Sequence, residues 1–177
     1  MKVQLKDLAV PLLLTLALLF VLEIFATTVL PIIGLHRYVI PFNILIVLYM
    51  GFKLQTPYLA ILIFIVQYFH HFFTVEGWEM GTVAGVVICL LISYLRDVIH
   101  FSSAAMTVFV TQVFQCVWFF IVSLLLYSKL GDMSFILDKF WRFIPESIII
   151  SLMAPFFFSI LDKFWTGSDE ASLGEGL

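Results

Sequence analysis

Long apolar runs separated by short polar connections restrict what this chain can fold into. The first run, from about residue 8 to residue 33, contains one charged residue, Glu23. Such a run is typical of a transmembrane helix, because about 20 helical residues cross the ~30 Å hydrocarbon core of a bilayer. Of all residues, 63% are hydrophobic and 12% are charged, whereas soluble domains have about 45–50% and about 25%. We therefore expect an integral membrane protein.

Six runs of this kind predict an all-α polytopic membrane protein with six transmembrane helices and no soluble domain. The predicted spans cover about residues 8–33, 39–52, 57–73, 77–95, 103–127 and 143–164. Residues 1–165 are thus expected to form a single six-span transmembrane domain. The longest connection, residues 128–142, is too short to fold as a domain of its own. The segment 166–177 is acidic and rich in Gly and Ser, and is expected to be a disordered tail.

The sixth span and the connection before it carry an amphipathic segment and two prolines. At 135–141 the charged residues Asp138 and Lys139 stand between apolar residues, which suits a short interfacial helix. Pro145 is expected near the N-terminus of the last helix, where proline is tolerated. Pro155 lies in the interior of that span and predicts a kink.

Six spans place both chain ends on the same side of the membrane, and the positive charges favour the cytoplasm for that side. Cytoplasmic loops carry the excess of Lys and Arg in membrane proteins. With the N-terminus inside, the cytoplasmic charges are Lys2, Lys6, Lys53, Arg96 and Lys163. The charges outside are then Arg37, Lys129, Lys139 and Arg142. The excess inside is a single charge, and it favours cytoplasmic termini.

Small residues recur at every fourth position in the fourth predicted span. They are Gly77, Gly81, Gly85, Cys89 and Ser93. Residues four apart share one face of a helix, so this stripe forms a shallow groove. Small-xxx-small stripes let membrane helices approach closely, at an oblique crossing angle. The sequence leaves open whether the groove receives another helix of this chain or a helix of a partner.

Several polar residues lie within apolar runs and call for hydrogen-bond partners. A carboxylate at Glu23 costs several kcal/mol in hydrocarbon unless it is paired or protonated. Gln112 and Gln115 suit hydrogen bonds between helices, although they also suit the lining of a ligand cavity. Asn43 follows Pro41 and is either an N-cap or a hydrogen-bonding residue between helices.

Catalytic and metal-binding patterns are missing from the sequence. There is no nucleophile elbow, P-loop, zincin motif or dinucleotide fingerprint. His70 and His71 lie near Glu76 and Glu79, but adjacent helical residues point about 100° apart and the spacing fits no metal motif. The sequence also lacks a basic face for nucleic acid. We therefore expect no enzyme activity, no cofactor, no metal site and no nucleic-acid partner.

Three segments resemble the family of the rod-shape-determining protein MreD. The first is Pro41–Tyr49, a proline and an Asn followed by an aliphatic run that ends at a Tyr. The second begins at Met80-Gly81-Thr82 and continues through an apolar run to Leu95. The third is Glu146–Phe164, with a late proline, aromatic residues and a charged end. The third predicted span departs from the family, because His70-His71 stands where an Asp is common.

The resemblance implies a non-enzymatic scaffold in the bacterial inner membrane that maintains rod shape and lateral peptidoglycan synthesis. Its implied partners are an MreC-like bitopic membrane protein, indirectly an MreB-like filament and peptidoglycan synthases, and membrane lipid. Helix packing or partner contact is then expected at Gly77, Gly81, Gly85, Pro41, Asn43 and Pro155.

A second function remains open, because the six-helix arrangement of this family is similar to substrate-binding subunits of vitamin transporters. That function, uptake of a vitamin or another small molecule, needs a polar cavity reached from outside. Its candidate lining residues are Glu23, Asn43, Gln67, Gln112 and Gln115.

Overall fold

A computed structural model describes residues 5–34, 38, 40–54, 56–74, 77–95 and 103–174, and only the backbone of 5–7, 130 and 166–174. Every regular element in these ranges is helical, as the apolar runs predict. The elements are α1 (Leu5–Ile32), α2 (Phe42–Lys53), α3 (Leu59–His70), a 3₁₀ turn η1 (His71–Phe73), α4 (Trp78–Leu95), α5 (Ala104–Leu130) and α6 (Met133–Gly174).

Within the described ranges, four helices are long and apolar enough to cross a membrane. Their candidate spans are Leu8–Ile32, Trp78–Leu95, Ala104–Lys129 and Met133–Trp165. The helices α2 and α3 have 12 residues each. At 1.5 Å per residue each is about 18 Å long, which is shorter than the ~30 Å hydrocarbon core. The structure is therefore compatible with a membrane protein, and it establishes four candidate spans where the sequence predicts six.

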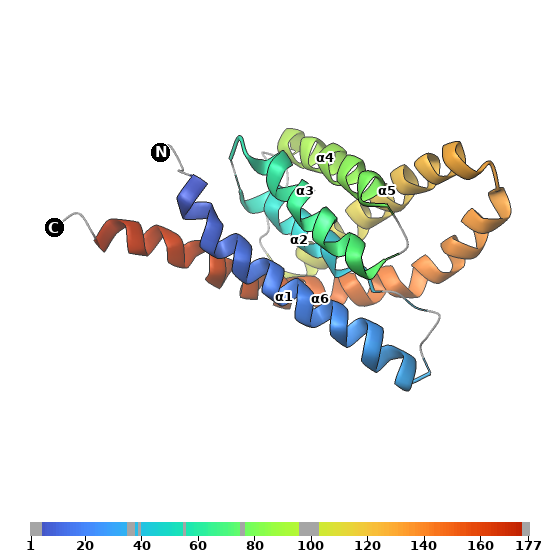
Figure 1. Ribbon diagram of the computed structural model, residues 1–177, viewed down its shortest axis with the longest axis horizontal. Coiled ribbons are helices and arrows are strands. Elements are labelled where there is room, and N and C mark those ends of the chain that lie inside the picture. Colours follow the sequence, from blue (N-terminus) through green and yellow to red (C-terminus); the bar gives the residue numbers. More distant parts are fainter. Residues whose placement is uncertain are drawn as a thin grey trace.

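The short helix α2 lies at the centre of the molecule (Figure 1), where it contacts α1, α3, α4, α5 and α6. Eleven of its twelve residues are buried. This accounts for its uninterrupted apolar sequence, because a helix that is apolar on all sides needs other helices or lipid around it. Pro41 occupies the N-cap position. Proline is tolerated there because the N–H group that it lacks would have no acceptor within the helix.

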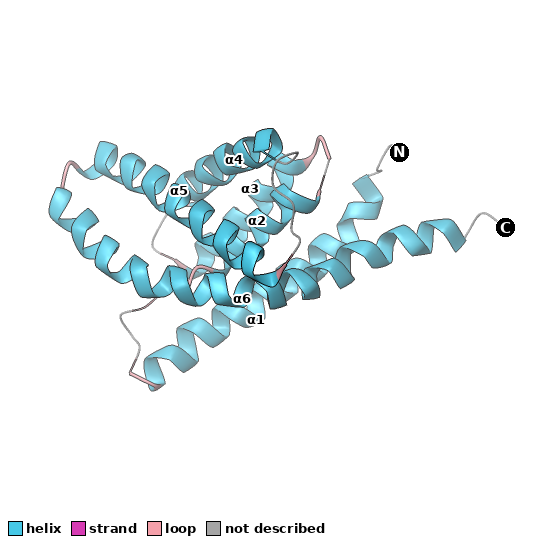
Figure 2. Cartoon of the chain, turned by 180° about the vertical axis from the view of Figure 1, so that it is seen from behind, coloured by secondary structure: helices cyan, strands magenta, loops and turns pink. Residues whose placement is uncertain are grey.

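The first and last helices pack along one another. Figures 1 and 2 both show α1 beside the C-terminal half of α6, and contacts join the two helices. Trp165 donates its indole Nε1–H to the hydroxyl of Thr15 at 3.2 Å. Thr15 in turn donates to the backbone carbonyl of Pro11 at 2.8 Å, within its own helix. These bonds connect the two ends of the chain.

The helices α5 and α6 form a hairpin that extends beyond the other helices (Figure 2). Gly131 ends α5 in the left-handed conformation with φ of +67°, which favours glycine. Asp132 then accepts hydrogen bonds from the backbone N–H of Ser134 at 2.9 Å and from its hydroxyl at 2.7 Å. These bonds stabilise the carboxylate and lower the pKa of Asp132.

The last helix is longer than the sixth predicted span. The predicted interfacial segment at 135–141 and the span from about residue 143 belong to one helix, α6, with Pro145 and Pro155 inside it. Figure 1 shows this helix bending in its orange section. Its backbone stays helical to Gly174, in the segment where the sequence predicts disorder. Glu170 and Ala171 in that segment have high helix propensity, so the helix can extend past the apolar run.

Candidate functional site

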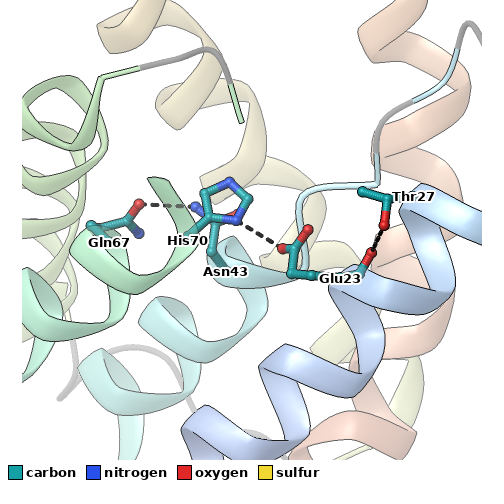
Figure 3. Close-up of polar contacts among 5 residues, drawn as sticks. All are labelled: Glu23, Thr27, Asn43, Gln67 and His70. Carbon is teal, nitrogen blue, oxygen red and sulfur yellow. Dashed lines mark hydrogen bonds and ion pairs between the residues drawn. The ribbon is translucent and has the colours of Figure 1, made fainter. Parts of the chain in front are cut away.

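Buried polar contacts join α1, α2 and α3 near the C-terminal end of α3 (Figure 3). Glu23 on α1 and His70 on α3 lie 2.8 Å apart, between Oε1 and Nδ1. Asn43 on α2 donates to Gln67 on α3 at 2.9 Å. The side chain of Glu23 is 2% exposed and that of His70 is 12% exposed. The carboxyl group that the sequence identifies as costly in an apolar run therefore has a partner from another helix.

The Glu23–His70 contact differs from the role that the sequence gives to the histidines. The sequence offers His70 and His71 together as possible metal ligands. In the structure His70 instead contacts Glu23. The described residues contain no group of three His, Cys, Asp or Glu side chains that could hold a metal ion. Glu76 lies outside the described residues. The available signal for this pair is Glu23 in the first apolar run and the two adjacent histidines of the third, since ionisable residues in an apolar environment need partners.

The Asn43–Gln67 bond leaves two hydrogen-bonding groups unused. Asn43 and Gln67 are 4% and 2% exposed, and Asn43 Oδ1 and Gln67 Nε2 have no partner among the described residues. Whichever way the two amides are turned, one –NH2 group and one carbonyl oxygen stay unpaired. Both residues line a small pocket of about 50 Å³, which is large enough for water because a water needs only about 10–15 Å³ of such volume. Asn43 lies inside α2 and bonds across helices, so it is not the N-cap.

The glycines of α4 face other helices of this chain. A Cβ at Gly81 would collide with the Gln67 amide on α3. A Cβ at Gly85 would lie 2.7 Å from Cγ2 of Ile63, which is also on α3. Gly77, before the first turn of α4, has more space, since a Cβ there would meet only a side chain of that turn at 3.4 Å. Cys89 continues the stripe toward α2, where its Sγ lies 3.7 Å from the carbonyl oxygen of Val47. The groove is therefore occupied from within the chain along Gly81–Cys89.

The glutamines of α5 bind serines of α6. Gln112 donates to Ser147 at 3.0 Å, and Gln115 donates to Ser151 at 2.9 Å. Ser151 also donates to the carbonyl oxygen of Gln112 at 2.8 Å. These three bonds hold the hairpin together through residues that are polar but uncharged. Pro155 lies one turn farther along α6.

The opposite end of α2 carries a second cross-helix contact. Tyr49 donates to Asp162 on α6 at 3.0 Å, and Lys53 lies 3.3 Å from the same carboxylate. The side chains of Lys53 and Asp162 are 45% and 38% exposed. Tyr49 and Asp162 belong to two of the segments that resemble the family, Pro41–Tyr49 and Glu146–Phe164. Lys53 lies in the turn of α2 that follows the first of these segments. The central helix α2 is thus attached to α3 at its N-terminal end and to α6 at its C-terminal end.

A cavity of about 710 Å³ lies between the hairpin and the ends of α2, α3 and α4. Its aromatic lining residues are Phe73, Trp118, Phe119, Phe135 and Phe143. Its charged lining residues are Lys129, Lys139, Arg142 and Glu146. The cavity shares Pro41, His70, Thr74, Gly77, Trp118 and Val122 with the small amide pocket.

The cavity includes none of the five residues that the sequence suggests for a ligand site, since Asn43 and Gln67 reach only the small neighbouring pocket. Pro41 and Gly77, which the sequence suggests for helix packing or partner contact, do line it. Glu23, Gln112 and Gln115 are absent from both linings. From the sequence, the basic residues of the hairpin bear on membrane orientation and on the interfacial segment 135–141, but not on a ligand site. Their recurrence on α6 three residues apart, at Lys139 and Arg142, was the available signal that they share a face.

Comparison of the chain with protein-family models, with curated proteins and with solved structures gives no match. The family resemblance therefore depends on the three segments themselves. In the structure the helices that contain these segments contact one another, α2 with α4 and α2 with α6.

Proposed function

We propose that the chain is a six-span, non-enzymatic scaffold of the bacterial elongation machinery, which acts in rod-shape maintenance and lateral peptidoglycan synthesis. The observation that carries this proposal is the meeting of Asn43 and Gly81 at one side chain, Gln67. These two residues belong to different family-like segments that are far apart in the sequence. Their convergence is expected if the segments form the packing core of the family's fold.

Six spans are consistent with the short helices because of where those helices lie. Eleven of the twelve residues of α2 are buried, and five other helices contact it. Backbone at membrane depth is tolerated where protein covers it, so a short helix at this position needs no lipid-matched length. α3 together with η1 extends the apolar helix to Leu59–Phe73. We place both termini in the cytoplasm, in keeping with the charge bias of the loops.

The proposed partner is an MreC-like bitopic protein, through which the scaffold meets an MreB-like filament and peptidoglycan synthases. Gly81 and Gly85 contact α3 of the same chain. We therefore place the partner contact outside this interface, on surfaces that α3 does not cover. Gly77 remains a candidate for partner contact, because it is only half-buried and has space beside it.

Deletion of the gene from its rod-shaped host tests the scaffold. Rounded cells are expected, and an intact copy of the gene should restore rods and co-purify a single-span protein in mild detergent. The protein level must be matched by immunoblot. Normal rods after deletion would contradict the proposal.

A second candidate function is a substrate-binding subunit for small-molecule uptake, and the cavity favours it. A volume of about 710 Å³ falls within the range of about 300–1,000 Å³ that is usual for ligand sites. The same deletion separates the two functions, since rods of normal shape that fail to take up one vitamin are expected only for the uptake subunit.

A further inference from the structure

We propose that the cavity between the hairpin and the ends of α2–α4 binds an anionic phospholipid of the surrounding bilayer. This inference goes beyond the scaffold function, although it assumes the membrane placement proposed above. Three cationic side chains and one carboxylate line the cavity, together with aromatic and aliphatic side chains. A lining that is both cationic and apolar is complementary to a molecule with an anionic group and hydrocarbon chains.

The length of the α5 wall fits a lipid chain. Trp118, Val122, Leu126 and Lys129 all line the cavity and lie on one face of α5, at intervals of four, four and three residues. At 1.5 Å per residue the distance along the helix from Trp118 to Lys129 is about 16 Å. One leaflet of a bilayer contributes half of the ~30 Å hydrocarbon core. The wall therefore matches one leaflet, with a cation next to the hairpin turn.

The partners of Lys129 and Arg142 leave these two cations available to a phosphate. Lys129 lies 3.6 Å from Glu79 across the gap between α5 and α4, and the two side chains are 62% and 58% exposed. Arg142 pairs at 2.7 Å with Asp138, which is 71% exposed. Exposed ion pairs contribute little, about 0–1 kcal/mol, so a lipid phosphate can compete with these carboxylates. Neither Glu79 nor Asp138 lines the cavity.

Arg142 also presents a donor that its own chain does not use. Its Nε is buried and has no hydrogen-bond acceptor within the part of the chain that the structure describes. A buried donor without an acceptor is unfavourable, and guanidinium groups bind phosphate oxygens through two parallel N–H donors. Arg142 lies level with Phe119, whose ring stacks on Phe143, so this donor is farther from the hairpin turn than Lys129.

The Lys129–Glu79 pair provides a test in which two substitutions of one contact have opposite effects. The full chain in detergent is mixed with equal amounts of dioleoyl phosphatidylglycerol and dioleoyl phosphatidylcholine, and native mass spectrometry measures the ratio of the two lipids bound. We expect one lipid to be retained, with phosphatidylglycerol in excess. Lys129→Gln should lower the ratio about fivefold, since a cation near a membrane surface contributes about 1 kcal/mol.

Glu79→Gln should raise the ratio, because it removes the carboxylate that competes with the phosphate for Lys129. If the ion pair were only structural, Lys129→Gln and Glu79→Gln would instead change the lipid ratio in the same direction. Lys53→Gln is the matched control, since Lys53 is also exposed and paired with a carboxylate but does not line the cavity. This control should leave the ratio unchanged.

Three outcomes would overturn the proposal. They are an equal loss of phosphatidylglycerol in Lys53→Gln and Lys129→Gln, a lower ratio in both Lys129→Gln and Glu79→Gln, and retention of a small non-lipid molecule or a partner protein in place of the lipid. The scaffold function is unaffected by these results, because it is judged by cell shape. Failure of that function and failure of the lipid site are therefore distinguishable.

Discussion

Helix α4 contacts α2, α3 and α5, and its contacts with α3 and with α5 differ in kind. Toward α3 it presents glycines, and an added Cβ at Gly81 or Gly85 would collide with Gln67 or Ile63. Toward α5 and the hairpin it borders a cavity of about 710 Å³. One side of the molecule is therefore closed by glycine contacts and buried polar bonds, while the other keeps space between its helices. Added side-chain volume should be costly on the first side and tolerated on the second.

Gly85→Leu should have the largest effect. Overpacking costs about 1–3 kcal/mol and occasionally more, and a Leu here needs space that Ile63 occupies from its first carbon onward. We expect the free energy of unfolding to fall by an amount at or above the upper end of that range. Thermal unfolding in detergent, followed by circular dichroism, measures this loss. Phe135→Trp is the control on the cavity side, where Phe135 is 43% exposed, and should change stability by less than about 1 kcal/mol. Equal losses in the two variants would contradict the difference between the sides.

Glu23→Ala should rank second, because it leaves buried His70 without its partner. Loss of one partner of a buried hydrogen bond costs about 1–3 kcal/mol. Glu23→Gln keeps a hydrogen-bonding group at the same position and should lose less, measured by the same unfolding experiment. If Glu23→Ala unfolds at the wild-type temperature, the Glu23–His70 contact does not stabilise the packing of α1 against α3.

Gly81→Ala should destabilise the wild type but stabilise a Gln67→Ala background. In the wild type the new methyl group displaces the Gln67 amide and breaks its bond with Asn43. Without the Gln67 amide that collision disappears, and Ala gains about 1 kcal/mol over Gly in a helix. A double-mutant cycle of unfolding free energies measures this reversal of sign. If Gly81→Ala changes the unfolding free energy in the same direction in both backgrounds, the Gln67 side chain is not what restricts residue 81 to glycine.

Gly77→Ala should have the smallest effect. An added Cβ meets only one side chain, at an ordinary contact distance of 3.4 Å. We expect a change within about 0.5 kcal/mol in stability. This substitution therefore separates partner contact from folding, and a loss of the co-purified single-span protein at unchanged stability would assign Gly77 to the partner surface.

The sequence predicts the helical class and several contact residues, but not which residues meet. The apolar runs identify all six helices, because each helix here is defined by local hydrophobicity. The need of Glu23 for a partner follows from desolvation alone, whereas His70 is 47 residues away and no local pattern connects the two. The glycine stripe predicts a close helix contact, and only the structure shows that α3 occupies it.

Helix continuity is the property that the sequence describes least well. The polar connection before the sixth span suggests a break, since charged residues there interrupt the apolar run. Lys139 and Arg142 are nevertheless good helix formers, and Arg142 pairs with Asp138 one turn away. The helix therefore continues through residues 133–142, and this continuity forms one wall of the cavity.

The bond between Trp165 and Thr15 bears on how the protein is made. The two residues are 150 positions apart, so at about 5–20 residues per second a ribosome needs roughly 8–30 s to add the second after the first. During that interval α1 has left the ribosome while the last helix does not yet exist. The hydroxyl of Thr15 can be satisfied meanwhile by the carbonyl of Pro11 in its own helix. The local bond is kept in the folded chain, where the hydroxyl donates to Pro11 while its oxygen accepts from Trp165.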